Sequence, residues 1–334
     1  MRHPHRGFTR PLIHPLTRPF TRRSALGLVA LALTGSAWAI DPSRITIIVP
    51  YPPGGLADII ARLSGKVLAQ NMGVPVIVEN KPGANGMLGL QAVAHAAPDS
   101  GTIGLVPASV LTVNPSIYKD SKVDTVEDLR HLTLAATFPN VLVVNNNLPV
   151  KNIDELLAAA KKQPLSFGTM GTGSSAHLNG EMLQTSGKVT LTHVPYKGSS
   201  AAMQDLMGGN IQMAFENLPV ALPLIQAGKI RAIAVTSEKP SPVAPEIPAL
   251  HDVLPGFRDN IWFGFIAPAR MPADYAARLQ QELGRAMQAE EVAGTLRQRG
   301  AVVQTSSSEA FRKTVADERS QWARLIKERN IQVN

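Results

Sequence analysis

The stretch Val49-Pro50-Tyr51-Pro52-Pro53-Gly54-Gly55-Leu56-Ala57-Asp58 decides the fold of this chain. The apolar run that leads into it, residues 45–49, predicts a buried strand. The stretch is therefore expected to contain the end of a strand, a rigid proline turn, a glycine pair and the start of a helix. After the glycines the apolar residues adopt a helical spacing, at Leu56, Ile59, Ile60, Leu63, Val67 and Leu68.

The glycine pair favours close approach of a ligand. Gly54 and Gly55 have no Cβ, so a ligand can reach their backbone. The first amides of the following helix lack intrahelical acceptors, and the helix dipole favours an anion there. We expect a carboxylate at this point, although a simple tight turn explains the same residues. Asp58 either complements the helix dipole or has a functional role, accepting from a ligand or bracing the loop.

A basic leader precedes this region. Residues 1–39 contain six arginines and no acidic residue. The apolar run at 25–33 is too short to span a membrane, and Ala37-Trp38-Ala39 is an A-x-A pattern, so we predict a secretory signal cleaved near Ala39. Arg22-Arg23 indicates twin-arginine export, with ordinary Sec export left open. The mature protein is expected in the periplasm.

Charge and cysteine content narrow the class of protein. The chain has 334 residues, no cysteine and a formal net charge of +8. Six of the positive charges lie in the leader, so the rest carries only +2, which gives no support to nucleic-acid binding. About 295 residues remain, which is enough for roughly two domains with a core that needs no disulfide.

Strands and helices alternate along the mature chain, which predicts an α/β fold. The pattern restarts after Asn152, whose spacing to Glu155 predicts a capped helix start. We therefore expect one lobe from residues 40–144 plus 261–334, and a second from 145–260. The triplet Val49-Pro50-Tyr51 returns as Val194-Pro195-Tyr196, and both follow strands, where open α/β sheets bind ligands. The expected strands are 45–49, 76–79, 102–106, 132–137, 141–144, 165–169, 189–194, 211–215, 230–235 and 261–267.

A second glycine-rich turn follows the strand at 165–169. Gly171-x-Gly173-x-x-Ala176 fits a dinucleotide pattern, but the end of the next strand, residues 193–196, lacks the acid that such a site needs. The glycines suit any anion held by amides, and Thr172, Ser174 and Ser175 add donors.

Ser174 and His177 raise the alternative of a hydrolase. The segment lacks the G-x-S-x-G elbow, and two residues so close on one helix point in different directions. Local packing of His177 is the simpler interpretation. The scattered histidines show no metal-binding spacing, so we predict neither a metal nor a cofactor.

Taken together, these blocks resemble the exported solute-binding receptors of tripartite tricarboxylate transporters, the Bug receptors. The resemblance covers nearly all of the mature chain. It rests on Tyr51-Pro52-Pro53-Gly54-Gly55-x-x-Asp58, Val78-Glu79-Asn80-Lys81-Pro82-Gly83-Ala84-Asn85-Gly86, Asn114-Pro115, Gly171-Thr172-Gly173-Ser174-Ser175-x-His177-Leu178, Val194-Pro195-Tyr196-Lys197-Gly198, Phe215-Glu216-Asn217-Leu218-Pro219 and Trp262-Phe263-Gly264.

The resemblance implies a two-lobed periplasmic-binding-protein fold, type II-like, with two parallel or mixed sheets flanked by helices and a ligand cleft between the lobes. It also implies a monomeric receptor that is not an enzyme and that delivers a small organic carboxylate to integral membrane transporter subunits. A sensory receptor remains an alternative. The implied ligand-binding residues are Tyr51, Pro53, Gly54, Gly55, Leu56, Ala57, Asp58, Ser109, Gly171, Thr172, Gly173, Ser174, Ser175, His177, Tyr196, Lys197 and Glu216.

The chain departs from the family pattern at two places. The two residues after Gly55 are usually hydroxyl residues, but here they are Leu56 and Ala57. Glu216 stands where aspartate is usual. The first departure removes side-chain donors beside the expected carboxylate. It therefore favours a less polar acid over citrate, although Leu56 could equally belong to the core.

Overall fold

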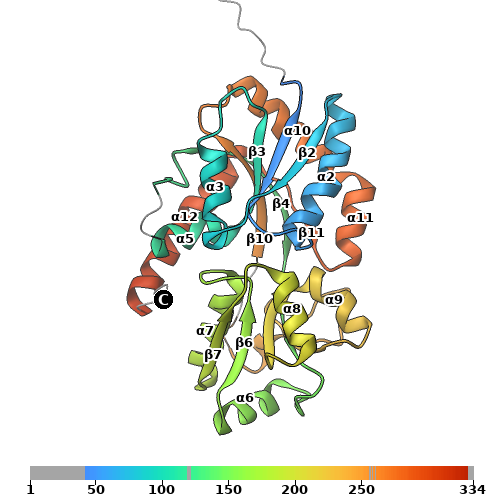
Figure 1. Cartoon of the computed structure of the whole chain (residues 1–334), viewed down its shortest axis with the longest axis vertical. Helices are drawn as coiled ribbons and strands as arrows, with labels where there is room; N and C mark the ends of the chain where they lie inside the picture. Colours follow the sequence, from blue (N-terminus) through green and yellow to red (C-terminus); the bar gives the residue numbers. More distant parts are fainter. Residues whose placement is uncertain (1–41, 119–121, 256, 258, 260, 330–334) are drawn as a thin grey trace, which may run out of the picture. The chain divides into compact units, whose positions relative to one another are not determined.

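The computed structural model describes residues 42–118, 122–255, 257, 259 and 261–329 (Figure 1). These residues belong to one compact unit of the chain, and the predicted leader with its cleavage site lies outside them. Within the described ranges, no helix combines the length and the apolar character that crossing a bilayer requires.

A mixed six-stranded sheet has the order β11-β4-β10-β3-β1-β2. β1 pairs in parallel with β2 and β3, whereas β10 runs antiparallel to β3 and β4 because the chain returns to this sheet from the opposite direction. The strands are β1 (Ile45–Val49), β2 (Val76–Asn80), β3 (Thr102–Pro107), β4 (Leu129–Phe138), β10 (Ile261–Pro268) and β11 (Val302–Val303).

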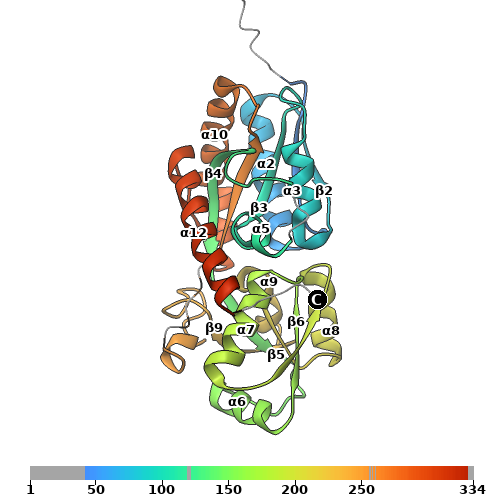
Figure 2. The same ribbon diagram turned by 90° about the vertical axis from the view of Figure 1, so that its left-hand side faces the viewer.

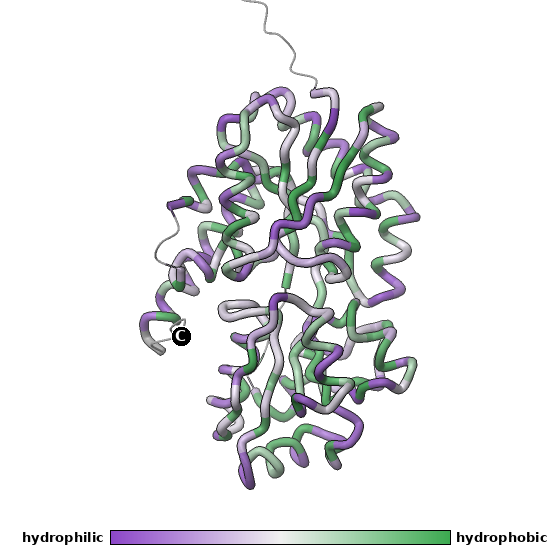
Figure 3. The backbone as a smooth tube through the Cα atoms, viewed as in Figure 1, coloured by the Kyte–Doolittle hydropathy of each residue, from purple (hydrophilic) through white to green (hydrophobic). Residues whose placement is uncertain are grey.

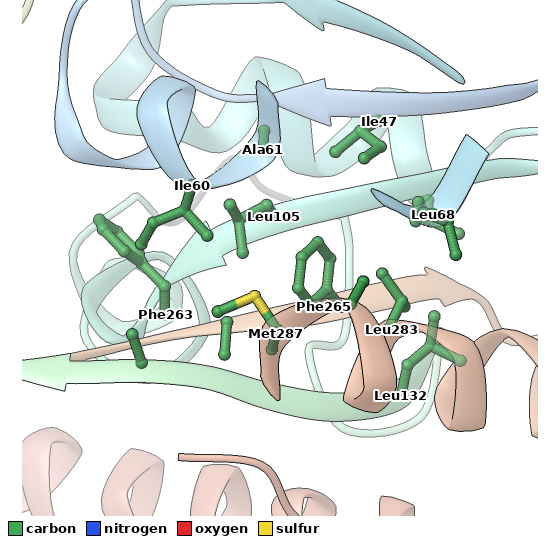
Figure 4. Close-up of a cluster of buried hydrophobic side chains, with 14 of the residues drawn as sticks. Ile47, Ile60, Ala61, Leu68, Leu105, Leu132, Phe263, Phe265, Leu283 and Met287 are labelled. Atoms are coloured by element: carbon green, nitrogen blue, oxygen red, sulfur yellow. The ribbon is translucent and has the colours of Figure 1, made fainter. Parts of the chain in front are cut away.

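Helices cover both faces of the first sheet (Figures 1 and 2). One face packs on α2 (Leu56–Met72), α10 (Ala273–Gln288) and α11 (Glu290–Gln298). Figure 4 shows this core, in which Ile60, Leu283 and Met287 meet strand residues such as Phe265. The other face packs on α3, α4 and α12, with α5 beside α4 and α12. The bounds on this face are η1 (Ala84–Gly86), α3 (Met87–Ala94), α4 (Ala108–Thr112), α5 (Asn114–Ile117) and α12 (Ser308–Arg329).

A five-stranded sheet has the order β7-β6-β8-β5-β9. β6 is parallel to β7 and β8, and β5 is antiparallel to β8 and β9. Helices α6 and α7 pack on one face, and α8 and α9 on the other. The elements are β5 (Asn140–Val144), α6 (Ile153–Lys162), β6 (Leu165–Thr169), α7 (Ser175–Gly187), β7 (Leu191–Pro195), α8 (Ser199–Gly208), β8 (Met213–Asn217), α9 (Leu218–Gln226), β9 (Arg231–Val235) and η2 (Leu250–Asp252).

Hydropathy follows this layering (Figure 3). The helices alternate between green and purple turns, as expected for helices with one buried face. The predicted start of α6 is confirmed, because the Asn152 side chain accepts from the Glu155 amide at 2.9 Å.

Some elements differ from the sequence-based expectation. β5 was expected in the first lobe, but it pairs with β8 and β9, so the chain changes sheets at Pro139 rather than after Val144. An apolar run of this kind suits either sheet, and only its pairing decides. Helix α11 and strand β11 were not anticipated.

Two stretches of chain that connect the sheets are hydrogen-bonded to one another. The Asn140 amide donates to Thr236 Oγ1 at 2.9 Å, and the Thr236 amide donates back to the Asn140 carbonyl at 2.9 Å. The Asp259 amide then donates to the Thr236 carbonyl at 3.0 Å. These hydrogen bonds tie together the chain segments that pass between the two sheets.

Candidate functional site

A cavity of about 250 Å³, here called the proximal cavity, is lined from both sheets. Its wall includes the start of α2 (Gly55–Asp58) and the start of α8 (Gly198–Ala201). Ser109 and Ser175 contribute hydroxyl side chains. The remaining lining residues are Tyr51, Pro52, Pro53, Pro107, Met170, Lys197, Gln204, Asn217, Ile261 and Phe263.

Two helix N-termini therefore open on the same cavity. The first intrahelical bond of α2 runs from Ile59 N to Gly55 O, so the amides at 56–58 precede it. In α8 the corresponding bond runs from Ala202 N to Gly198 O, ahead of which lie the amides at 199–201. Such amides carry partial positive charge and lack intrahelical acceptors. Their convergence makes the proximal cavity suited to an anion.

Asp58 braces the loop before α2. Its carboxylate accepts from the Gly54 amide at 3.1 Å and from Asn80 Nδ2 at 3.0 Å. Arg62 donates to both of its oxygens, at 2.8 and 3.0 Å. Burial alone would raise the pKa of Asp58, but the hydrogen bonds from Arg62, Gly54 and Asn80 outweigh it and hold the pKa below its usual value. The carboxylate is therefore ionised and neutralised by Arg62, so its charge does not oppose an anion in the cavity.

Gly54 has a positive φ of 90°, and a Cβ there would lie 3.1 Å from Ser200 Oγ. A side chain at this position would be strained and would press on the start of α8. The glycine thus lets the loop of the first sheet approach the second at the edge of the cavity.

Leu56 and Ala57 belong to the core and to the cavity wall together. They are 2% and 3% exposed and pack in the core between α2 and the first sheet. Both also line the proximal cavity, as do Ile261 and Phe263. Leu56 and Ala57 therefore add apolar surface to the cavity and contribute no side-chain donor of their own beside the α2 amides.

Glu216 lies behind the cavity wall, fully buried. Its Oε1 accepts from Ser199 Oγ at 3.0 Å and from the Asn217 amide at 2.8 Å. Burial raises the pKa of Glu216 to about 7, although these two hydrogen bonds oppose the shift. Ser199 and Asn217 both line the cavity, so this carboxyl is one hydrogen bond away from it.

The second glycine-rich turn, residues 171–173, packs mainly against a loop and a short helix that lie beside the six-stranded sheet. A Cβ on Gly171 would lie 3.1 Å from Asn85 Oδ1, and one on Gly173 would lie 2.8 Å from Asn114 Oδ1. The Tyr118 hydroxyl donates to the Thr172 carbonyl at 2.9 Å. These contacts hold the turn against the loop at 83–86 and the segment at 114–118, and they require its glycines.

Ser174 and His177 do not form a nucleophile and base pair. Ser174 Oγ donates to the Gly171 carbonyl at 2.6 Å and caps α7 by accepting from the His177 amide. His177 Nδ1 accepts from the Gly173 amide at 3.2 Å, and its ring stacks on His193 with centroids 4.1 Å apart. Burial lowers the pKa of His177 to about 4, which keeps the ring neutral. This geometry gives the hydrolase alternative no support.

A second cavity of about 300 Å³, here called the distal cavity, adjoins the first. It shares Tyr51, Met170 and Lys197 with the proximal cavity. Its other walls are the loop at 82–86, Gly171 and Tyr196. The Tyr51 hydroxyl donates to Asn85 Oδ1 at 3.0 Å, and the Tyr196 hydroxyl donates to Asp205 at 2.6 Å. Both tyrosines therefore present ring faces and edges rather than free hydroxyls.

The family model described as the tripartite tricarboxylate transporter family receptor, TctC, matches residues 60–331. The chain belongs to this family. It is 36% identical over 323 residues to the UPF0065 protein in the tcbD-tcbE intergenic region of Pseudomonas sp. (strain P51), covering 94% of this chain and 96% of that relative.

Solved TctC-type structures share the fold. The periplasmic binding protein BugD superposes with a TM-score of 0.83 at 31% identity, covering 87% of this chain and 99% of BugD. R. palustris Rpa4515 with adipate superposes with a TM-score of 0.83 at 29% identity, again covering 87% of this chain and 99% of that protein. The resemblance seen in the sequence blocks is therefore confirmed, as is the two-sheet binding-protein fold.

Most residues predicted for the site of this TctC receptor lie around the two cavities. Gly171 and Tyr196 line only the distal cavity. Thr172 lies against Tyr118 and Gly173 against Asn114, and neither lines a cavity described above. Ser174, His177 and Glu216 are buried behind the walls. The predicted residues that do line the proximal cavity are Tyr51, Pro53, Gly55, Leu56, Ala57, Asp58, Ser109, Ser175 and Lys197.

The start of α8 was not included in the predicted set. Ser199, Ser200 and Ala201 line the proximal cavity, and so does Gln204 one turn later. The signal was present in the sequence. Gly198 follows a strand and a tyrosine and precedes a helix, as Gly55 does, so the argument applied to α2 would have identified these residues too.

Proposed function

We propose that this TctC receptor captures a small organic carboxylate in the proximal cavity. The observation that carries the proposal is the convergence of the amides at 56–58 and 199–201 on one cavity, with the Asp58 charge already neutralised by Arg62. These amides would each donate to a carboxylate oxygen. Hydrogen bonds to a charged group are worth about 1.5–3 kcal/mol each, so a few account for specific binding.

The cavity wall favours an acid with an apolar body. Leu56, Ala57, Ile261 and Phe263 line it, and neither residue after Gly55 adds a hydroxyl. A monocarboxylate, or a dicarboxylate with an aliphatic or aromatic body, would leave fewer of its polar groups unpaired here than citrate. Rpa4515 with adipate, which superposes on this chain, is consistent with that preference.

The ligand would be released to integral membrane transporter subunits after export of the mature receptor to the periplasm. Support comes from the family assignment and from the basic leader that ends in an A-x-A pattern. Binding would shift an equilibrium between open and closed arrangements of the sheets, with bending at the paired segments of Asn140, Thr236 and Asp259. We propose transport rather than catalysis, because Ser174 and His177 form no catalytic pair.

Thermal-shift measurements on the mature receptor test this proposal. Aliphatic and aromatic mono- and dicarboxylates, citrate, and the methyl ester and amide of each acid form the panel. A ligand at about 100 times its dissociation constant adds roughly 2.7 kcal/mol of stability. At least one carboxylate should raise the melting temperature while its ester and amide do not. Equal shifts by an acid and its amide would refute carboxylate recognition, and hydrolysis of the ester would favour the enzyme alternative.

A further inference from the structure

The turn before helix α7 contacts the end of α5 at a place apart from both cavities. The hydroxyl of Tyr118, the residue after α5, donates to the Thr172 carbonyl at 2.9 Å. Ile117 lies against the same turn, because a Cβ on Gly173 would be 3.4 Å from the Cδ1 atom of Ile117. Tyr118, Ile117 and Thr172 line neither the proximal nor the distal cavity. This contact therefore joins elements of the two sheets without facing a ligand.

An apolar cluster includes Ile117, the neighbour of Tyr118. Leu178 of α7 packs with Val113, which precedes α5, and with Ile326 of α12. Ile117 and Trp322 pack against the same three side chains. Figure 2 shows α12 reaching from the six-stranded sheet to the level of α7. Separation of the two sheets would expose this apolar surface to water and break the Tyr118 hydrogen bond.

Both ends of the hydrogen bond between Tyr118 and Thr172 are fixed by local contacts. The Tyr118 amide donates to the Asn114 carbonyl at 2.8 Å, which holds the tyrosine at the end of α5. The turn that carries Thr172 is closed by Ser174, whose amide and hydroxyl donate to the Gly171 carbonyl at 3.1 and 2.6 Å. Burial raises the pKa of Tyr118, so the hydroxyl keeps its proton and remains a donor. A bond between two fixed groups stabilises one arrangement of the sheets and is lost when they separate.

We propose that Tyr118 is a positioning residue that holds the closed arrangement of this receptor, and so sets how long a ligand stays bound, without contacting the ligand. The inference rests on the proposed function, because a bound carboxylate is taken to leave when the sheets separate. Loss of one hydrogen bond of this kind shifts the ratio of closed to open receptor by about three- to tenfold. Every ligand that needs the closed arrangement then loses affinity by the same factor, because the contacts of the ligand itself do not change.

Other roles for Tyr118 would have different signatures. A purely structural hydrogen bond would lower the melting temperature when it is removed, but it would leave the ratio of closed to open receptor unchanged. A direct contact with the ligand would weaken some acids more than others, because acids differ in the groups that they place near one side chain. The closed fraction and the uniformity of the loss across acids therefore distinguish these roles.

Fluorescence energy transfer in the unliganded mature receptor measures the closed fraction. The chain has no cysteine, so Gln281→Cys on α10 and Lys161→Cys on α6 provide two exposed labelling positions, one beside each sheet. Tyr118→Phe should lower the closed fraction, and Ile117→Ala should change it in the same direction. Tyr275→Phe is the matched control, because it removes the hydroxyl of a buried tyrosine in the core of the first sheet that lines neither cavity. The control should leave the closed fraction unchanged.

Calorimetry and stopped-flow kinetics with several carboxylates of the thermal-shift panel complete the test. Tyr118→Phe should weaken all of them by about three- to tenfold, mainly through faster dissociation, because association begins with the open receptor. An unchanged closed fraction with an unchanged dissociation rate would overturn the role of Tyr118, and so would losses that differ from acid to acid. If no acid binds the unmodified receptor, the proposed function fails, while energy transfer without ligand still decides whether Tyr118 holds the closed arrangement.

Discussion

Substitution of Asp58 by asparagine tests whether the α2 loop is pre-organised by that carboxylate. Asparagine keeps the size, but it removes the charge and turns one acceptor into a donor facing Arg62 or Asn80. The Arg62 side chain is 52% exposed, so that ion pair contributes at most about 0.5 kcal/mol after screening. The bonds from the Gly54 amide and Asn80 to the charged carboxylate account for most of the expected loss, about 2 kcal/mol.

Thermal unfolding without ligand measures this loss, which corresponds to a drop of roughly 3–4 °C for a chain of this size. Calorimetry should then show weaker binding of every carboxylate by a similar factor, because the Gly54 loop and the amides at 56–58 lose their fixed positions. Asp154→Asn is the matched control, since Asp154 is likewise in the first turn of a helix, α6, and is exposed. It shares any effect on the helix dipole but braces no loop.

The stability that Asp58 contributes should depend on pH. Hydrogen bonds and Arg62 hold the pKa of Asp58 below its usual value, so its stabilising contribution is present above the ordinary pKa of about 3.9 and disappears as the pH falls through the lower, folded-state pKa. The difference between the receptor and Asp58→Asn should shrink in that acid range. Unchanged melting and unchanged affinity would refute the bracing role. Lost affinity with unchanged melting would instead place Asp58 in contact with the ligand.

Three further predictions concern the cavity walls. Burial raises the pKa of Glu216 to about 7, so carboxylate affinity should fall between about pH 6 and pH 8 as this acid ionises behind Ser199. Calorimetry on Glu216→Gln should then show an affinity that changes little over this pH range, whereas the same pH dependence in the variant and the unmodified receptor would exclude Glu216 as the cause. Gly171→Val should weaken binding at least about tenfold, because its side chain would displace Asn85, which lies 3.1 Å from the new Cβ, and hold the sheets apart. It should also lower the melting temperature, because Gly171 has a φ of 133°, at which a side chain is strained. Wild-type affinity in calorimetry would show that this contact plays no part in closure. Leu56→Ser with Ala57→Thr should shift preference towards citrate, and citrate binding the unmodified receptor more tightly than every apolar acid would contradict the ligand class.

Local patterns predicted the elements that form the site. The change of apolar spacing at Leu56 marked the start of α2, and the Asn152 and Glu155 pair marked the start of α6, because both signals lie within a few consecutive residues. The same spacing placed Leu56 in the core or in the cavity wall. The structure shows both, since the first turn of a buried helix faces the sheet on one side and the cavity on another.

Local patterns could not predict contacts between residues that lie far apart in the sequence. The glycines at 171 and 173 suggested an anion site, yet their space is taken by Asn85 and Asn114, which lie far away in the sequence. The sheet membership of β5 depends on pairing with β8 and β9 rather than on its own apolar residues. Helix α11 follows α10 after Ala289 alone, with neither glycine nor proline to mark the break.

A structure of the receptor with the tightest-binding carboxylate from the thermal-shift panel tests the central claim most directly. The account predicts carboxylate oxygens within hydrogen-bond distance of backbone amides at both 56–58 and 199–201, with the body of the ligand against Leu56 and Phe263. A carboxylate bound outside the proximal cavity, or held by side chains with those amides unengaged, would contradict it.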